Sequence, residues 1–390
     1  MNWFRRMQKI IACLLLVSML AALAAGCGAA QETPAAPKAA VTQTQSNVPA
    51  WQQKWDQTVA AAKKEGTLTI YGDVTPMLRE ALKAFQNKYG IQMEIVFGIS
   101  TDITEKWLKE RDAGLAIADV FHLSSGLAPS MKPKGGFVAV DPHFILPEAS
   151  DPKLWLQGKL PFVDPVDKTV LALNSTYTSY VTVNTDIVKE GQLKSYRDLY
   201  SPQWKDKVVF FDPTVPSASL GLAVFLMKDI FGLEGGKDFF RQFAASRPAI
   251  TRDAAQQIDW VVRGKNPIGV GVGSAVSSDY KARGAPVTIN RFVEGGSINA
   301  GSGILEVPPN SPHPNATKVY INWLMTEEGQ AVFAKGMAAP PMRLGVNVEG
   351  IDPAKIPLPG EKVFLYDLDH SNFNPEATKI LKEIFADQVK

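Results

Sequence analysis

The chain has 390 residues, 21% of them charged, and its basic and acidic residues nearly balance at 41 against 39. A near-neutral surface argues against a nucleic acid as partner, because the phosphate backbone selects strongly basic proteins. The length is well above that of a typical single domain, so we expect two domains, each with its own hydrophobic core.

The first residues predict an exported protein. Basic residues near the start precede an apolar run that ends at Ala25. A membrane-spanning helix needs about 20 apolar residues, and this run is shorter. Residues 1–26 are therefore expected to be a cleaved signal peptide. Residues Leu23–Cys27 resemble the lipobox of bacterial lipoproteins, which implies that Cys27 is lipidated. An ordinary signal-peptidase site with an incidental cysteine is the alternative.

Residues 27–50 predict a lipidated, disordered tether. They are mostly Ala, Gln, Thr and Pro, and cannot bury enough apolar surface to offset the entropy lost on ordering. Cys13 lies in the leader, so Cys27 is the only thiol of the mature chain and no internal disulfide is expected. Such a tether holds a folded protein near the membrane while letting it turn.

Strand and helix patterns alternate from Trp51 onward. The expected elements are a strand at 67–71, a helix with Met77, Leu78, Ala81, Leu82 and Phe85 on one face, a strand at 91–97, a helix that begins with a capping box of Asp102 and Glu105, and a strand at 119–123. Strands that alternate with helices of this length indicate a mostly parallel α/β sheet.

The alternation resumes after a Pro-rich middle. The expected elements are a strand at 207–211, a loop at 213–219, a helix at 220–230, a helix with Phe239, Phe240 and Phe243, a helix through Ile258 and Val262, strands at 268–272 and 287–289, and helices from Asn315 and at the C-terminus. These patterns predict a second α/β unit.

Three segments, in this order and spacing, are similar to a known family. They are Gly66–Glu94, Val183–Asp186 and Asn299–Phe333. They resemble the type II periplasmic-binding-protein fold, and within it extracellular solute-binding protein family 1 and its ferric-iron-like branch, the substrate-binding lipoproteins of ABC transporters.

The resemblance implies an α/β architecture of two lobes joined by two crossover strands. The first lobe would comprise residues 51–179 and 300–390, and the second residues 180–299. The ligand would lie in the cleft between the lobes, which closes by hinge bending. The implied partners are a small-molecule ligand and the permease and ATPase subunits of an importer. We expect an extracytoplasmic monomer that is anchored to the bacterial membrane through Cys27.

The first lobe offers candidate ligand-binding residues in three loops that follow strands and precede helices. They are Asp73, Ser100, Thr101, Ser124 and Ser125. Unpaired N–H groups and the partial positive charge of a helix N-terminus favour anions there. Simple helix capping by these side chains is the alternative interpretation.

The second lobe offers five further candidates. Ser217, Ala218 and Ser219 match the family's ligand loop by resemblance, and Gly273 and Ser274 end a strand where small residues let a ligand approach the backbone. A plain tight turn is the alternative for the glycine.

Residues of the crossovers and the returning chain complete the candidate set. Tyr177, Tyr180, Glu294 and Asn299 lie in or near the two crossovers. Arg343 would add a charge-assisted contact to an anion, with a surface salt bridge as the equally weighted alternative.

The expected ligand is a small anion, such as a phosphonate, phosphate ester, sulfonate or carboxylate. Iron-binding members of the family place adjacent tyrosines where this chain has Ser274 and Ala275. Ferric iron or a ferric complex, held by a rearranged set of oxygens, remains the alternative. The four histidines are scattered, and neither a metal ligand set nor a cofactor is expected.

Two functions of other classes also remain open. Ser278 and Lys281 have the Ser-x-x-Lys spacing of penicillin-recognising enzymes, which would suit a secreted serine hydrolase, but the companion motifs are missing and a surface helix is the expected context. The sequence also lacks Gly-x-Ser-x-Gly, His-Glu-x-x-His and Walker motifs, so no enzyme is expected. A sensory or adhesive lipoprotein of the same fold is the third possibility.

Overall fold

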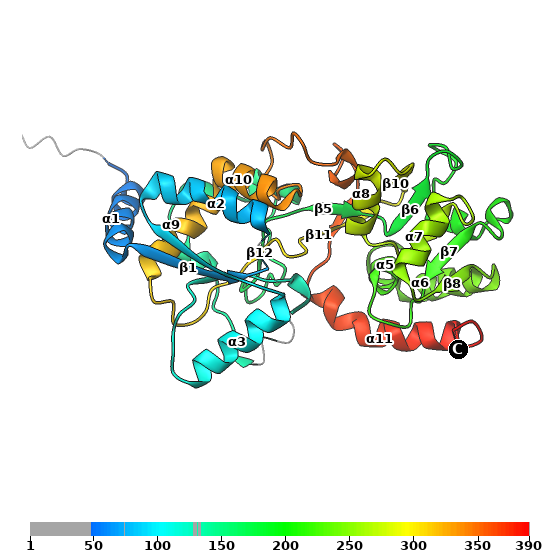
Figure 1. The fold of residues 1–390 in the computed structure, drawn as a ribbon, viewed down its shortest axis with the longest axis horizontal. Coiled ribbons are helices and arrows are strands. Elements are labelled where there is room, and N and C mark those ends of the chain that lie inside the picture. Colours follow the sequence, from blue (N-terminus) through cyan, green and yellow to red (C-terminus); the bar gives the residue numbers. More distant parts are fainter. Residues whose placement is uncertain (1–47, 74, 128–130, 132–133, 390) are drawn as a thin grey trace, which may run out of the picture. The chain divides into compact units, whose positions relative to one another are not determined.

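The computed structural model describes residues 48–389 except 74, 128–130 and 132–133 (Figure 1). The predicted signal peptide, the lipidation site Cys27 and all but the last three residues of the tether lie outside the described residues. Within the described part, no helix is long and apolar enough to cross a membrane.

A three-stranded parallel sheet forms the centre of the first lobe. Strand β1 (Thr67–Gly72) lies between β2 (Gln92–Phe97) and β3 (Val120–His122), which confirms the three strands expected from the sequence. A short antiparallel pair, β4 (Leu171–Ala172) and β12 (Ile304–Leu305), extends this lobe. The helices of the lobe are α1 (Ala50–Glu65), α2 (Pro76–Tyr89), α3 (Ser100–Asp112), α9 (Pro314–Met325) and α10 (Glu327–Met337).

Helices α2 and α10 pack together, as do α1 and α9, so residues from both ends of the sequence build one core (Figure 1). Leu78, Leu82 and Phe85 are fully buried as expected, whereas Met77 is 51% exposed. The expected capping box at Asp102 is wrong. Helix α3 begins two residues earlier, at Ser100, because Ile99 holds the N-cap position with an extended backbone.

The second lobe contains a five-stranded mixed sheet in the order β10-β6-β9-β7-β8. Its strands are β6 (Val181–Asn184), β7 (Val208–Phe211), β8 (Ala249–Thr251), β9 (Ile268–Val270) and β10 (Val287–Ile289). The helices that cover it are α5 (Ala218–Phe225), the π-helical turn η9 (Leu226–Ile230), α6 (Gly232–Ala245), α7 (Ala254–Val262) and α8 (Ser274–Ala282). The expected second α/β unit is therefore confirmed.

Short 3-10 helices occupy the irregular regions. They are Ser125–Leu127, Asp141–His143, Pro147–Ala149, Pro152–Leu154, Leu156–Gly158, Tyr196–Tyr200, Pro202–Trp204 and Pro353–Lys355.

A third sheet lies where the chain passes between the two cores. Strand β11 (Gly296–Asn299) pairs antiparallel with β5 (Thr176–Thr178) and parallel with β13 (Val363–Leu365). The first core ends before β5, and the second begins at Tyr180. Tyr180 is the first residue of the second core, at the position where the sequence analysis places the start of the second lobe.

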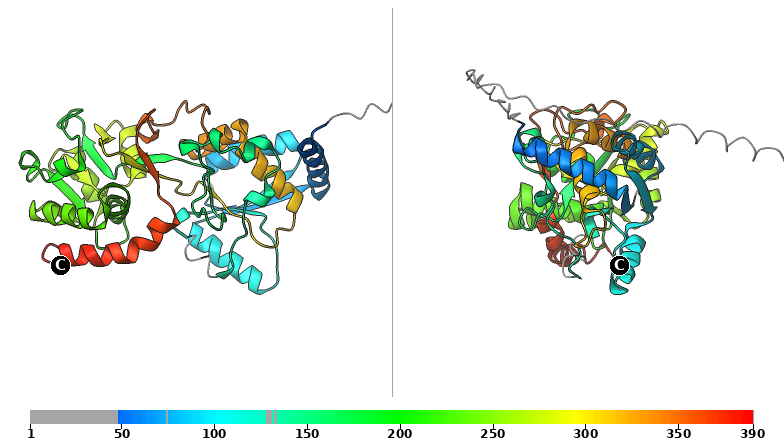
Figure 2. Two further views of the ribbon diagram at one scale, coloured as in Figure 1. Left: turned by 180° about the vertical axis from the view of Figure 1, so that it is seen from behind. Right: turned by 90° about the vertical axis from the view of Figure 1, so that its left-hand side faces the viewer.

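The C-terminal helix α11 (Leu368–Ile384) packs against the second lobe. Ala377, Leu381 and Phe385 belong to its core, and both views of the ribbon place α11 alongside α5 and α6 (Figures 1 and 2). This packing differs from the expected assignment of residues 300–390 to the first lobe. The apolar side of the helix finds its complementary surface on α5 and α6, which the local sequence pattern could not indicate.

Glu306 is a buried acidic residue of the first lobe. Its side chain is 1% exposed, and neither carboxyl oxygen has a hydrogen-bond partner among the described residues. Burial, with a smaller contribution from the nearby Asp164 carboxyl, holds the pKa of Glu306 well above its usual range. Folding therefore retains a proton that the unfolded chain releases once the pH rises above about 4.5, so stability falls as the pH increases beyond that value.

We predict that Glu306→Gln reduces this loss of stability by about 1 kcal/mol per pH unit above pH 4.5, because the amide stays neutral. Denaturant unfolding of both proteins between pH 4 and pH 7 measures the difference. The exposed Glu105 provides the matched control, and Glu105→Gln should follow the wild-type pH dependence. Parallel curves for wild type and Glu306→Gln would contradict the prediction.

Candidate functional site

A pocket of about 680 Å³ lies between the two lobes beside the crossover strands. Residues of both lobes, of β5 and β11, and of the start of α11 line it. They are Ser124, Ser125, Thr176, Thr178, Tyr180, Pro216, Ser217, Ala218, Leu220, Gly221, Gly273, Ser274, Asn299, Gly301, Tyr366, Ser371, Asn374 and Pro375. Eight of these were expected from the sequence, namely Ser124, Ser125, Tyr180, Ser217, Ala218, Gly273, Ser274 and Asn299.

The polar groups of the described lining are neutral. Eleven of its 18 described residues carry a side-chain hydroxyl or amide, and none of the 18 is Asp, Glu, Lys, Arg or His. Among these described residues, the titratable side chains are the phenols of Tyr180 and Tyr366. Burial raises the pKa of both, that of Tyr366 to about 12, so both phenols are neutral at physiological pH. The pocket thus presents neutral donors and acceptors.

Two helix N-termini form the second-lobe wall. Ser217 is the N-cap of α5, and its Oγ accepts a hydrogen bond from the Leu220 N–H (3.4 Å) and donates one to the Asp212 carbonyl (3.3 Å). Gly273 is the N-cap of α8, and Ser274 is the first residue of that helix. Both helices begin at the pocket, so their unpaired N–H groups and positive dipole ends favour negative charge there.

Asp212 holds the loop before α5 in shape. Burial opposes its ionisation, but hydrogen bonds from Thr214 and the Arg252 guanidinium (2.6 Å) lower the pKa of Asp212. The carboxylate accepts both the N–H and the hydroxyl of Thr214, which closes the turn that leads to Ser217. This explains how a loop of small residues keeps a fixed path.

The first-lobe wall is fixed by backbone hydrogen bonds. The Ser124 N–H donates to Ser100 Oγ (3.0 Å), and the Ser125 N–H donates to the Gly301 carbonyl (2.9 Å). Asn299 Oδ1 accepts the Gly301 N–H (2.6 Å). The serine loop after β3 and the returning chain after β11 are therefore joined at the pocket.

Tyr180 lines the pocket in a backbone conformation that non-glycine residues rarely adopt. Its φ is +61°, and its N–H donates to Thr178 Oγ1 (2.9 Å). The phenol hydroxyl donates to Ser297 Oγ (3.4 Å), and the ring lies so near Gly221 that a Cβ there would approach it to 2.9 Å. Strained residues cluster at ligand sites, and this one is held by contacts on three elements.

Three of the predicted first-lobe candidates do not line the pocket. Ser100 is buried and supports Ser124 through the hydrogen bond above. Thr101 is exposed on α3, with its hydroxyl 3.4 Å from the Asp102 carboxylate. Asp73 accepts a hydrogen bond from the Ser302 hydroxyl (3.0 Å), next to the returning chain. Of the five first-lobe candidates, the structure brings only the two serines after β3 into the pocket.

Four other candidates are engaged elsewhere. Ser219 is fully buried and donates to the Phe211 carbonyl (2.7 Å), and Glu294 accepts hydrogen bonds from the Ser195 hydroxyl and the Tyr196 N–H. The remaining two are buried away from the pocket and are considered next.

Tyr177 lies on the opposite face of β5 from the pocket. The Arg291 guanidinium, which pairs with Glu361, lies 4.3 Å from its ring centre. Arg343 donates hydrogen bonds to the Met325 carbonyl (2.6 Å) and to the Glu148 carboxylate (2.7 Å). It therefore forms a salt bridge, the alternative role considered for it, and does not contact the pocket. Both side chains serve the core.

The sequence interpretation missed several lining residues. Thr176 and Thr178 flank Tyr177, and strand periodicity places them on the face opposite to it. That alternation was the available signal. Tyr366, Ser371 and Asn374 come from the C-terminal segment, which no local pattern connected to the site.

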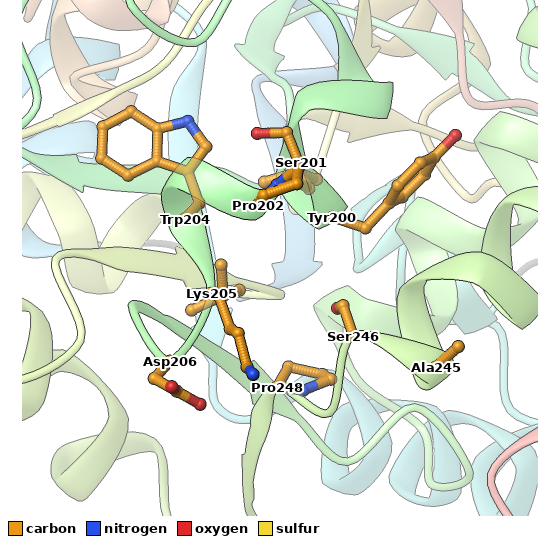
Figure 3. A pocket seen from close by; sticks show the side chains of 11 residues that line it. Tyr200, Ser201, Pro202, Trp204, Lys205, Asp206, Ala245, Ser246 and Pro248 are labelled. Carbon is orange, nitrogen blue, oxygen red and sulfur yellow. The ribbon is translucent and has the colours of Figure 1, made fainter.

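A smaller pocket of about 240 Å³ lies on the second lobe alone (Figure 3). Figure 3 shows Lys205, Asp206 and Pro248 on one side of it and Trp204, Ser201 and Tyr200 on the other. The Ser201 hydroxyl and the Trp204 indole N–H are shielded from solvent and have no hydrogen-bond partner among the described residues. A ligand could not reach them without rearrangement, so of these two pockets the one between the lobes is the better candidate.

The described residues contain no group of three or more His, Cys, Asp or Glu side chains that could hold a metal ion. His122 is fully buried between the Ile304 carbonyl (2.7 Å) and the Tyr320 hydroxyl (2.9 Å), and burial lowers its pKa to about 4. His313 pairs with Asp119 (2.8 Å). These histidines stabilise the first lobe.

The Ser-x-x-Lys pair does not form a nucleophile and its base. The Lys281 ammonium binds Asp352 (2.8 Å), and the Ser278 hydroxyl also turns toward Asp352 (3.5 Å). A lysine held in an ion pair cannot serve as the neutral base of a neighbouring serine. The geometry therefore does not support the hydrolase.

Comparisons with known proteins agree with this architecture. The family model for bacterial extracellular solute-binding proteins matches residues 80–356. A Bordetella ferric binding protein has a TM-score of 0.64 at 19% identity, with 82% of this chain and 98% of that chain covered. Ferric iron-binding protein A of Mannheimia haemolytica, in an open conformation, has a TM-score of 0.66 at 18% identity, with coverage of 83% and 99%.

A third solved structure has another ligand. The periplasmic binding protein AfuA of Actinobacillus pleuropneumoniae, with fructose-6-phosphate bound, has a TM-score of 0.53 at 20% identity, covering 83% of this chain and 99% of that chain. At these identities the similarity shows the fold, and the expected two-lobed fold is confirmed.

A buried histidine, His370, holds the start of α11 in ion pairs near the pocket. His370 Nδ1 lies 2.5 Å from Asp367 and Nε2 lies 2.8 Å from Asp229, with the Tyr366 ring packed against the imidazole. Burial disfavours the charged imidazole, but the two carboxylates outweigh it and raise the pKa of His370 to about 9. Its stabilising contribution is complete below the unfolded pKa of about 6.5 and is lost as the pH rises toward 9.

We predict that wild-type stability falls between pH 7 and pH 9 by at most about 1.4 kcal/mol per pH unit from this group, and that His370→Gln lacks this dependence. Thermal and denaturant unfolding across that range would measure it. His143 Nδ1 lies 3.2 Å from the Val140 carbonyl, and burial lowers the pKa of His143, so this side chain stays neutral between pH 7 and pH 9. His143→Gln should therefore keep the wild-type slope. An unchanged slope in His370→Gln would refute the assignment.

Proposed function

The chain belongs to the family of bacterial extracellular solute-binding proteins, and we propose that it is the substrate-binding subunit of an ABC importer that captures a small anionic solute in the pocket between its lobes. The observation that carries the proposal is the lining, in which hydroxyls, amides and two helix N-termini converge without a described carboxylate. Phosphonates, phosphate esters, sulfonates and carboxylates are the ligand classes that fit.

The electrostatic argument has two steps. Anionic oxygens accept several hydrogen bonds, and Ser, Thr and backbone N–H groups of α5 and α8 supply neutral donors for them. A described carboxylate within the lining would repel the anion, and there is none. Hydrogen bonds to charged groups contribute about 1.5 to 3 kcal/mol each, so a few of them suffice for micromolar binding.

The cellular setting follows from the N-terminus and the family. Extracellular solute-binding proteins work outside the cytoplasm, and the Leu23–Cys27 segment supports lipidation at Cys27 as the membrane anchor. We propose that the protein acts as a monomer on the outer side of the cytoplasmic membrane, delivering its ligand to permease and ATPase subunits.

Ferric iron is the second candidate ligand. Two solved structures of similar fold are ferric-binding proteins, and two phenols, Tyr180 and Tyr366, line the pocket. A hard trivalent cation prefers several anionic oxygens, whereas both phenols are protonated and the described lining has no carboxylate. The lining therefore favours the anion.

We predict that Ser274→Ala weakens binding of the cognate anion by about tenfold, because it removes one hydroxyl donor at the start of α8. Calorimetry with a panel of phosphonates, phosphate esters, sulfonates and carboxylates measures the effect. Thr101→Ala is the matched control, since this exposed hydroxyl lies outside the pocket and its loss should leave affinity unchanged.

The same panel includes ferric citrate. Tight ferric binding with a visible phenolate charge-transfer band, together with no response to any organic anion, would replace the anion by iron as the ligand.

We also predict hinge closure on binding. The two lobes have separate cores and are joined through the β5 and β11 strands, so a ligand that contacts both walls of the pocket should draw them together. Small-angle scattering with and without saturating ligand should show a smaller radius of gyration in the complex. Identical curves would count against closure.

A further inference from the structure

The C-terminal segment forms one wall of the pocket and is rigidly held there. The Tyr366 N–H donates to the Ile298 carbonyl of β11 (3.0 Å), and α11 then packs into the second core through Leu381 and Phe385. Tyr366, Ser371 and Asn374 of this segment line the pocket. Their positions are therefore set before any ligand arrives, which is the condition for a specific contact.

The hydrogen bonding of this wall leaves both donors and acceptors for a ligand. The Tyr366 hydroxyl donates to Asn374 Oδ1 (3.1 Å). That bond uses the phenol proton, so the phenol oxygen keeps acceptor capacity and the Asn374 amide nitrogen keeps its two protons.

A proline adds a third group. Pro375 lies inside α11 and has no N–H, so the carbonyl of Ser371, four residues earlier, lacks its usual helical donor. Ser371 and Pro375 both line the pocket. The interruption of the helical ladder thus provides a backbone acceptor at the same wall as the Tyr366–Asn374 pair.

Such a wall suits a hydroxyl group better than an oxyanion. A hydroxyl both donates and accepts, so it matches adjacent acceptor and donor groups, whereas an oxyanion only accepts and is repelled by a carbonyl or a phenol oxygen. The donors that suit an oxyanion lie on the other wall, at the N-termini of α5 and α8. A pocket of about 680 Å³ has room for a ligand that spans both walls.

We propose that Tyr366 and Asn374 are specificity-determining residues, and that they select anions whose organic part carries hydroxyl groups. This inference rests on the proposed function, because it assumes that an anionic group occupies the second-lobe wall. It adds the chemical class of the remainder of the ligand and assigns its recognition to the C-terminal segment.

Matched ligand pairs test the inference on the full-length protein. Propyl phosphate and glycerol 3-phosphate share a charged group and carbon count, and propanesulfonate and 2,3-dihydroxypropanesulfonate form a second pair. Calorimetry should show at least about tenfold tighter binding of the hydroxylated member of at least one pair, the difference expected from one or two additional hydrogen bonds.

Variants of the wall then locate the effect. Tyr366→Phe removes the hydroxyl alone, and Asn374→Leu removes the amide at similar volume, so each should lower the preference for the hydroxylated member by at least about fivefold. Tyr200→Phe is the matched control, because Tyr200 lies on the second lobe outside this pocket and its variant should keep the preference. Unfolding curves establish that each variant is folded. If one of the two variants fails to fold, the ligand preference of the other still tests the inference.

The outcomes separate the two proposals. If both members of every pair bind equally, or if the preference survives in the folded wall variants, the inference is overturned while the proposed function stands. If no anion of either pair binds and ferric citrate does, the proposed anionic ligand is wrong and the inference falls with it.

Discussion

The pairing of β11 with β5 on one side and β13 on the other determines which residues meet at the pocket. Strand β11 is in register with Tyr177 and Thr178 of the first crossover and with Leu365 of the C-terminal segment, so segments about 120 and 70 residues distant in sequence are brought together. Close packing maintains this register. A Cβ on Gly296 would lie 2.3 Å from the Tyr177 ring, so only glycine fits where the strands approach.

This register makes Tyr177 structural and its neighbours accessible. Alternate residues of a strand face opposite sides, and the buried Tyr177 packs under the Arg291–Glu361 pair while Thr176 and Thr178 face the pocket. The charged groups near the crossovers are thereby kept paired beneath the sheet. The pocket receives only their neutral neighbours, and this separation is what gives it a lining suited to an anion.

The sequence predicted the parts of the site that depend on local structure. Ser217 and Ser274 follow strands and begin helices, and such a position lies at the carboxyl edge of a parallel sheet whatever the rest of the chain does. Tyr366 and Asn374 depend on the pairing of β13 and on the docking of α11 onto the second core, which are contacts between distant segments. Arg343 failed as a candidate for the same reason, since its partner Glu148 is 195 residues away.

The docking of α11 also determines how the walls move. Because α11 packs on the second core, we expect the Tyr366–Asn374 pair to move as one body with the N-termini of α5 and α8. Ion pairs strengthen this attachment, with His370 held by Asp229 of the same lobe. We therefore expect a hinge motion to leave both of these walls fixed relative to each other and to move the serine loop of the first lobe together with Gly301, to which it is hydrogen-bonded. In that arrangement the second lobe recognises the ligand, and closure of the first lobe excludes water from the pocket and retains the bound ligand.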